Sequence, residues 1–257
     1  MTAHTPPKPA YDPNVKVEGN GPPLILVPGL DGTGRLFYRQ VPLLAREFHV
    51  ATYALRDDAP DMATLVEDLA AVVRKLSPTG EPVVVVGESF GGTLAMSFAV
   101  AHPELVRALV VLNSFPYFRP AYRLRLAVAA LGLMPWGAMR LVRRLTAFRL
   151  HSRYTHRAEL QRFLRETGYT TRDGYVGRLR ILQQYDLRSR LGDVKPPTLF
   201  LAADRDHLVP SLEQASYMAE RVPRASLRVL EGHGHICLIA PNLDLRTIIA
   251  HWGLGAA

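Results

Sequence analysis

Apolar residues fall in short runs along the chain, and most segments between the runs repeat their apolar positions with helical spacing. From Leu65 to Leu76, for example, apolar residues recur every three or four positions, after a capping box that begins at Thr64. The runs have the length and composition of buried strands. They are Leu24–Val27, His49–Ala54, Val83–Val86, Ala108–Leu112, Thr198–Leu201 and Ser226–Leu230. This alternation predicts an α/β fold with a doubly wound, mostly parallel sheet.

The alternation stops between Phe115 and about Gly192, where the pattern is helical throughout. A connection of this length is typical of a lid or a binding element. We therefore expect a core made of residues 1–115 and 192–257, with residues 116–191 inserted as a helical cap between the sixth and seventh strands. Ligands of open α/β sheets bind beyond the carboxyl ends of the strands, so the cap is expected to cover the site there.

A serine motif stands directly after the run Val83–Val86. It is Gly87-Glu88-Ser89-Phe90-Gly91, a Gly-x-Ser-x-Gly pattern that leads into apolar residues with helical spacing. A strand, a tight turn and a helix are the context in which this motif presents a nucleophile. The two glycines lack a Cβ and allow a tight backbone, while the helix N-terminus favours negative charge near Ser89. A glycine-rich turn with a chance serine is the competing interpretation.

A catalytic serine needs an adjacent base and a third group that orients the base. Asp206 follows the run Thr198–Leu201, and His235 follows the run Ser226–Leu230. The three candidates therefore stand in the chain order Ser, Asp, His, each at the end of a predicted strand, which is the order of α/β-hydrolases rather than of chymotrypsin or subtilisin.

Each role has a nearby competitor. Asp204 could replace Asp206 as the acid, and His233 could replace His235 as the base. Glu88 is expected to point away from the face of the nucleophile. Asp31 could line the mouth of the pocket or stabilise a glycine-rich turn, and we favour the turn.

The chain resembles the α/β-hydrolase superfamily over nearly its whole length. Asp206-His207-Leu208-Val209-Pro210 is similar to the acid-bearing loop of that family, and Gly234-His235 to its histidine loop. Leu24–Gly32 is similar to its oxyanion strand and loop, although many members carry His-Gly where this chain has Pro28-Gly29. The serine motif and the loop after Pro28 also resemble a narrower group of esterases and acyltransferases that includes plant phytyl-ester and diacylglycerol acyltransferases.

The resemblance implies a role for each of these residues. Ser89 would be the nucleophile, His235 the general base and Asp206 the group that stabilises the imidazolium. The backbone N–H of Phe90 would form one half of the oxyanion hole, and Leu30 would supply the other N–H. The implied function is hydrolysis of carboxylic esters with a lipophilic acyl or alcohol group. An acyltransferase or a thioesterase would use the same triad, and a ligand-binding receptor without turnover is a further alternative.

The predicted cap is unusually basic. Residues 116–190 contain sixteen arginines, no lysine and four acidic residues, a net charge of +12, while the whole chain carries +8. The arginines alternate with apolar residues, so this region could bind anionic lipid or attract an acidic substrate. A solvated arginine-rich surface is the plainer alternative. No nucleic-acid-binding motif accompanies the charge, and no nucleic-acid partner is expected.

The cysteine and histidine content bears on whether the chain forms a disulfide or binds a metal. Cys237 is the one cysteine of the chain, so no intrachain disulfide can form. Because Cys237 lies in an apolar run, we expect its thiol to be packed in the core. His207, His233 and His235 lack a recognisable zinc-ligand spacing, and no metal or cofactor is expected.

The polar, proline-rich N-terminus lacks the apolar centre of a signal peptide, and no run reaches the length of a membrane span. The expected location is the cytoplasm, with peripheral membrane attachment as an option.

Overall fold

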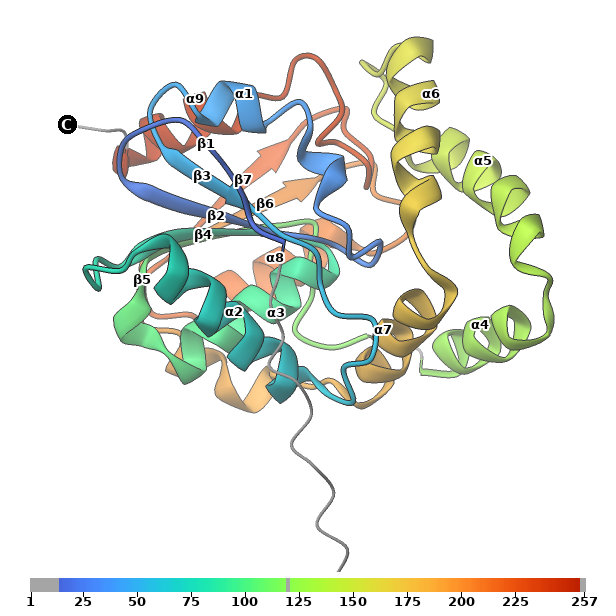
Figure 1. Cartoon of the computed structure of the whole chain (residues 1–257), viewed down its shortest axis with the longest axis horizontal. Helices are drawn as coiled ribbons and strands as arrows, with labels where there is room; N and C mark the ends of the chain where they lie inside the picture. The colour runs from blue at the N-terminus through green and yellow to red at the C-terminus, as the bar shows by residue number, and fades with distance from the viewer. Residues whose placement is uncertain (1–13, 119–120, 255–257) are drawn as a thin grey trace, which may run out of the picture.

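The computed structural model describes residues 14–118 and 121–254, and a single sheet lies at the centre of this part of the chain (Figure 1). The sheet has seven strands among the described residues, in the order β1-β3-β2-β4-β5-β6-β7. β1 pairs antiparallel with β3, and all other neighbours are parallel. The strands are β1 (Lys16–Glu18), β2 (Pro23–Val27), β3 (His49–Thr52), β4 (Val83–Glu88), β5 (Val106–Leu112), β6 (Thr198–Ala203) and β7 (Ala225–Leu230). The predicted fold class is confirmed.

The central strands are apolar on both faces because helices cover both faces. Along β4, Val83 and Val85 pack into one hydrophobic core, and Val84 and Val86 pack into the other. All six predicted runs form strands. β1 has no such run, because it lies at the edge of the sheet, is exposed, and pairs through its backbone alone.

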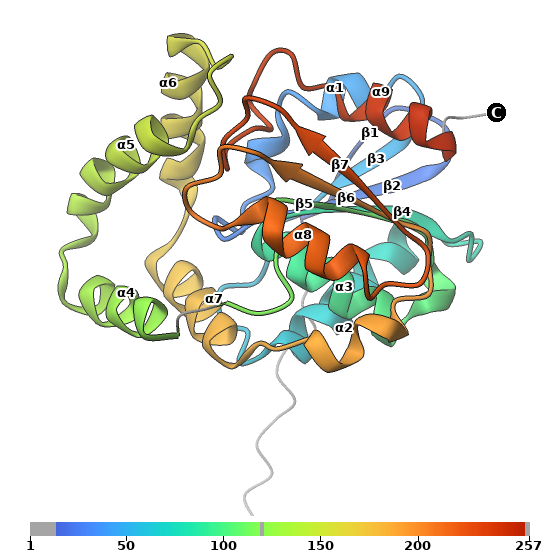
Figure 2. The ribbon, with the colours of Figure 1, turned by 180° about the vertical axis from the view of Figure 1, so that it is seen from behind.

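Helices α1 and α9 lie on one face of the sheet, and α2, α3 and α8 lie on the other (Figures 1 and 2). Their bounds are α1 (Val41–Leu44), α2 (Met62–Leu76), α3 (Phe90–Ala101), α8 (Ser211–Ala219) and α9 (Leu245–Ile249). α2 begins before the predicted capping box. Asp61 is its N-cap, and the Asp61 carboxylate accepts a 2.8 Å hydrogen bond from the N–H of Thr64, which therefore belongs to the first turn.

The helical cap leaves the core after β5 and returns to it at β6, beside the carboxyl ends of the parallel strands (Figures 1 and 2). The predicted position between a sixth and a seventh strand is wrong in its numbering, because five strands of the described sheet precede the cap. Tyr117 and Asp186 pair through their backbones where the chain leaves and re-enters the core. The cap helices are α4 (Ala121–Leu133), α5 (Met139–Leu150), α6 (Arg157–Glu166) and α7 (Arg172–Gln184).

Candidate active site

Ser89 occupies a sharp turn between β4 and α3. Its backbone has φ 54° and ψ −117°, a conformation that residues with a Cβ rarely adopt. The turn is tight because the start of α3 passes directly over the end of β2. A Cβ on Gly91 would collide with the carbonyl of Val27, and a Cβ on Gly87 would collide with the backbone of Gly91. Glycine at both positions therefore permits the turn that holds the Ser89 hydroxyl at the carboxyl edge of the sheet.

Ser89, His235 and Asp206 form a continuous hydrogen-bonded chain. Ser89 Oγ lies 3.1 Å from His235 Nε2, and His235 Nδ1 lies 2.6 Å from Asp206 Oδ2. Because an ionised carboxylate can only accept hydrogen bonds, the imidazole carries its proton on Nδ1 and turns Nε2 toward the serine as an acceptor. The three side chains follow β4, β7 and β6, whose carboxyl ends meet at one edge of the sheet.

The Asp206 carboxylate is fixed by several donors in addition to His235. Its Oδ1 accepts hydrogen bonds from the N–H groups of Leu208 at 2.9 Å and Val209 at 3.0 Å, and its Oδ2 accepts from the Ser211 hydroxyl. Burial opposes ionisation, but the charge and hydrogen bond of His235 hold the pKa of Asp206 below its usual value. Burial alone would lower the pKa of His235, yet Asp206 raises it above its usual value.

The competing acid and base lie outside this chain of hydrogen bonds. Asp204 Oδ1 accepts a 2.7 Å hydrogen bond from the N–H of Gly232, which holds the loop after β7. His233 Nδ1 lies 2.9 Å from the Ser152 hydroxyl of the cap. The structure therefore places both residues in supports for the histidine loop and brings neither to Ser89.

The loop that carries His235 is held from two sides. On the cap side, the N–H of Ile236 donates a 2.9 Å hydrogen bond to the carbonyl of Leu150 at the end of α5. On the core side, Asn113 Nδ2 donates to the His235 carbonyl at 3.0 Å, while Asn113 Oδ1 accepts from the N–H of Ala203 at 2.8 Å. No motif identified Asn113. Its sequence signal is its place directly after β5, where it adopts φ 47°, a conformation that asparagine tolerates.

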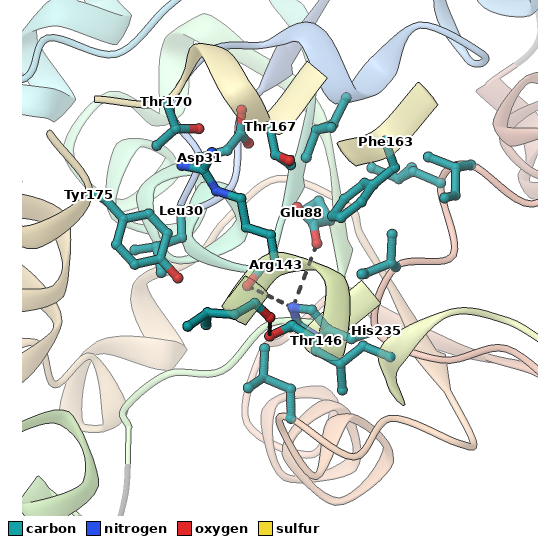
Figure 3. Close-up of a pocket in the computed structure, with 18 of the residues that line it drawn as sticks. Leu30, Asp31, Glu88, Arg143, Thr146, Phe163, Thr167, Thr170, Tyr175 and His235 are labelled. Atoms are coloured by element: carbon teal, nitrogen blue, oxygen red, sulfur yellow. Dashed lines mark hydrogen bonds and ion pairs between the residues drawn. The ribbon is translucent and has the colours of Figure 1, made fainter. Parts of the chain in front are cut away.

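Glu88 lies in the site, so the expectation that it points away is wrong. Its Oε1 is 3.7 Å from His235 Nε2, and the two side chains face each other in Figure 3. The strand pleat explains this orientation, because Glu88 shares a face of β4 with Val84 and Val86, and the core on that face includes the residues after His235. Burial raises the pKa of Glu88 to about 7, despite the opposing charge of His235.

The loop after β2 and the start of α3 carry the two N–H groups that the resemblance assigns to an oxyanion hole. Leu30 lines the cavity next to Ser89, and Phe90 is the first residue of α3. Among the described residues, neither N–H donates a hydrogen bond to another group. Asp31 holds the turn as expected, since its Oδ1 accepts from the Thr33 N–H at 2.9 Å and from the Thr33 hydroxyl, and it also lines the cavity.

A buried arginine of the cap fixes the same loop. Arg178 of α7 is 2% exposed, and its Nε donates to the Leu30 carbonyl at 2.9 Å. One terminal nitrogen donates to the Asp31 carbonyl at 3.1 Å, and the other lies 3.3 Å from Asp57 Oδ1. The guanidinium sits so close to the loop that a Cβ on Gly32 would collide with it. The cap therefore sets the position of the loop, a role that no local sequence pattern indicated.

A cavity of about 170 Å³ lies between the cap and the carboxyl edge of the sheet. Ser89, Glu88 and His235 form part of its lining. Its apolar walls include Leu36, Met139, Leu150, Phe163, Ile236 and Ile239. In Figure 3, Asp31, Thr170 and Tyr175 gather on one side and Phe163 lies on the other, with the Arg143 side chain running toward the polar side. The cavity thus has a polar part around Asp31, Thr170 and Tyr175 and an apolar part around Phe163.

Residues 14–118 and 121–254 contain no group of three or more His, Cys, Asp or Glu side chains arranged to hold a metal ion. Cys237 is fully buried, and burial raises the pKa of its thiol above the usual value. The position of Cys237 in the core agrees with the sequence-based expectation.

The comparison with known families decides what kind of protein this is. The sequence model described as alpha/beta hydrolase fold matches residues 22–240. The chain belongs to the α/β-hydrolase fold family. The position of the Ser89 turn at the carboxyl edge of a mostly parallel sheet agrees with that membership.

Curated relatives of this α/β-hydrolase differ in what their names say. The "Putative carbamate hydrolase RutD" of Serratia proteamaculans is 27% identical over 244 residues, which are 90% of each chain. Phytyl ester synthase 1, chloroplastic, of Arabidopsis thaliana is 25% identical over 272 residues; the match spans 91% of this chain and 37% of that protein. Among solved structures, MenH from S. aureus superimposes with a TM-score of 0.79 at 19% identity, covering 93% of this chain and 97% of that one.

The buried guanidinium of Arg178 should matter to the stability of the fold. Arg178→Met keeps the apolar stem but leaves two loop carbonyls without their donor, so we expect a loss of about 2–4 kcal/mol in the free energy of unfolding. Urea denaturation measures this loss. Arg180→Met is the matched control, because Arg180 lies on the same helix and is exposed, and it should change the free energy by no more than about 0.5 kcal/mol. Equal losses in both variants would contradict the assigned role of Arg178.

Proposed function

We propose that this α/β-hydrolase cleaves carboxylic esters through an acyl-enzyme intermediate on Ser89. The observation that carries the proposal is the hydrogen-bonded chain from Ser89 through His235 to Asp206, at 3.1 and 2.6 Å, on the wall of a cavity. A serine hydroxyl becomes an effective nucleophile when an adjacent, oriented base takes its proton.

The proposed reaction has two halves. Ser89 Oγ attacks the acyl carbon while His235 Nε2 takes the hydroxyl proton; the tetrahedral intermediate then collapses, and the leaving alcohol receives that proton. Water next attacks the acyl-enzyme, His235 takes a proton from the water, and Ser89 receives it as the carboxylic acid leaves. Asp206 stays ionised throughout and stabilises the imidazolium that forms in each half.

Negative charge on the tetrahedral oxygen would be stabilised by the N–H groups of Leu30 and Phe90. Neither group donates elsewhere among the described residues, so both are available to a substrate oxygen. The N–H of Phe90 also belongs to the first turn of α3, where the helix dipole favours an anion. Arg178 supports this arrangement by holding the carbonyls of Leu30 and Asp31 on the other side of the loop.

The cavity favours a substrate with a lipophilic acyl or alcohol group. Aliphatic and aromatic side chains from both the cap and the core line it, so an alkyl group would gain stability by leaving water. Acyl transfer is the second candidate, because the relative from Arabidopsis is named a phytyl ester synthase. The two reactions share the acyl-enzyme and differ in whether water or an alcohol attacks it. Thioester hydrolysis would use the same steps.

The triad makes a direct prediction about rates. Ser89→Ala, His235→Ala and Asp206→Asn should each lower kcat for an ester by about 10⁴-fold, and the losses should not add, because the residues act as one unit. Asp204→Asn is the matched control and should retain most of the activity.

Covalent labelling tests the nucleophile directly. A fluorophosphonate should label the wild-type chain once, at Ser89, as shown by peptide mass mapping. Full activity of Ser89→Ala, or no labelling of the folded protein, would refute the mechanism.

The acyl-chain length of the ester tests the substrate preference, and an added acceptor alcohol distinguishes hydrolysis from acyl transfer. In a series of p-nitrophenyl esters, kcat/KM should rise with acyl length, because each buried methylene contributes about 0.8 kcal/mol, or about fourfold. Adding an acceptor alcohol should leave the rate of p-nitrophenol release unchanged if deacylation by water follows, with free acid as the product. A new ester as the main product would instead assign acyl transfer. A carbamate belongs in the panel because of the name of the Serratia relative.

Glu88 should shift the pH dependence of the reaction. His235 must be neutral to accept the serine proton, so activity rises as the pH rises through the pKa of His235. Besides Asp206, the Glu88 carboxylate raises that pKa. The Glu88 carboxyl, 3.7 Å from Nε2, becomes charged as the pH rises through about 7. Glu88→Gln removes that charge, so the acidic limb of the kcat/KM profile should move to lower pH. An acidic limb that stays in place or moves upward would show that Glu88 does not act on His235.

A further inference from the structure

The outer side of α5 is apolar although it faces solvent. Leu141, Leu145 and Phe148 are 62%, 64% and 77% exposed. Residues at these intervals lie on one side of a helix, within about 60° of one another around its axis. We call these three side chains the outer face of α5. The neighbouring helix α4 also exposes Leu126 and Leu133, so apolar exposure is a property of this whole corner of the cap.

Arginines border the outer face on both sides. Around the helix axis, Arg140 and Arg144 lie on one side of the apolar stripe and Arg149 lies on the other. All three are exposed, and among the described residues none of them forms an ion pair. An apolar stripe between two rows of arginines is typical of helices that lie in the surface of an anionic bilayer, with the long side chains reaching the headgroups.

A second copy of the chain is a poorer partner for this surface than a bilayer. α5 contains four arginines and no acidic residue over Met139–Leu150. If two copies joined through this face, like charges would meet across the interface without counter-charges, which costs stability. Anionic lipid headgroups would supply the missing charges, and the adjacent acyl chains would cover the exposed apolar side chains.

We propose that the outer face of α5 docks on bilayers that contain anionic lipids. Leu141, Leu145 and Phe148 enter the interfacial layer, and Arg140, Arg144 and Arg149 bind the phosphates around them. The helix lies along the surface, with a length of about 18 Å. Among the described residues, no helix has the length and apolar character that a membrane crossing requires.

The same helix separates this surface from the proposed active site. Met139, Arg143, Thr146 and Leu150 line the cavity from the opposite side of α5. Val142 lies between the two sides; it lines the cavity and is also 38% exposed. Docking would therefore bring the cavity wall at Val142 to the lipid surface, where a lipophilic ester could enter. This last step rests on the proposed ester hydrolysis, whereas the docking itself does not.

Binding to vesicles tests the docking without any turnover. The full-length protein is floated with vesicles of phosphatidylcholine alone or of phosphatidylcholine with phosphatidylglycerol. Each arginine near an anionic surface strengthens binding by about fivefold, so the three should favour the anionic vesicles by on the order of 100-fold. The difference should shrink as salt rises, because the screening length falls from ~10 Å at 0.1 M to ~3 Å at 1 M.

Two sets of variants separate the outer face from general surface effects. Replacing Leu141, Leu145 and Phe148 by Ser should weaken binding by roughly tenfold or more; the control replaces the exposed Val17, Leu227 and Val229 of the edge strands by Ser. Replacing Arg140, Arg144 and Arg149 by Gln should remove the preference for anionic vesicles. Its control replaces the exposed Arg74, Arg107 and Arg224 by Gln, the same loss of charge in the core domain.

The outcomes distinguish the proposal from its competitors. Loss of binding in the α5 variants, with the controls unchanged, supports docking through this face. No binding, equal binding to neutral and anionic vesicles, or the same loss in the controls overturns it. A dimer in sedimentation velocity that dissociates in the Leu141, Leu145 and Phe148 variant also overturns it, and assigns the face to a second copy. Turnover of a short soluble ester should stay within about twofold in every variant, so failure of the proposed chemistry would be seen separately.

Discussion

The close approach of α3 to the ends of β2 and β4 is the constraint on which the rest of the site depends. The backbones at Gly87, Gly91 and Val27 touch, and this contact leaves no room for a side chain at either glycine. It turns the chain through a positive φ at Ser89 and starts α3 immediately afterwards. The serine, the helix N-terminus and the loop after β2 are therefore brought together by backbone packing. The hydrogen-bonded arrangement of Ser89, His235 and Asp206 depends on that backbone packing.

The cap is part of the site as well as its cover. Arg178 of α7 holds the loop that carries the Leu30 N–H, and the carbonyl of Leu150 at the end of α5 holds the loop that carries His235. Core residues secure the same elements from below, as Asn113 does for the His235 carbonyl. The cap and the core thus both hold the loops that flank Ser89, which keeps Ser89, His235 and Asp206 within hydrogen-bond distance of one another.

The features that depend on a local sequence pattern could be predicted from the sequence. The central strands follow from continuous apolar runs, since parallel strands buried on both faces carry little else, and the Ser89 turn follows from its glycines. β1 was missed because an exposed edge strand needs only backbone partners. Glu88 was misplaced because its direction depends on which face of β4 meets the histidine loop. Arg178 is separated from Leu30 by 148 residues and is one of sixteen arginines in residues 116–190. Its burial singles it out among them, and burial depends on the fold, so the sequence pattern could not indicate its role.

The contact between Arg178 and the loop after β2 also bears on how such an enzyme can change over evolution. Pro28, directly before the loop glycine Gly29, offers neither a side-chain donor nor a backbone N–H. Its loop instead takes its support from an inserted segment. A cap without an arginine at this place would leave the carbonyls of Leu30 and Asp31 without their donor. Cap and loop are therefore coupled through one side chain, so a change of residue 178 can alter the site while the sheet and its helices stay the same.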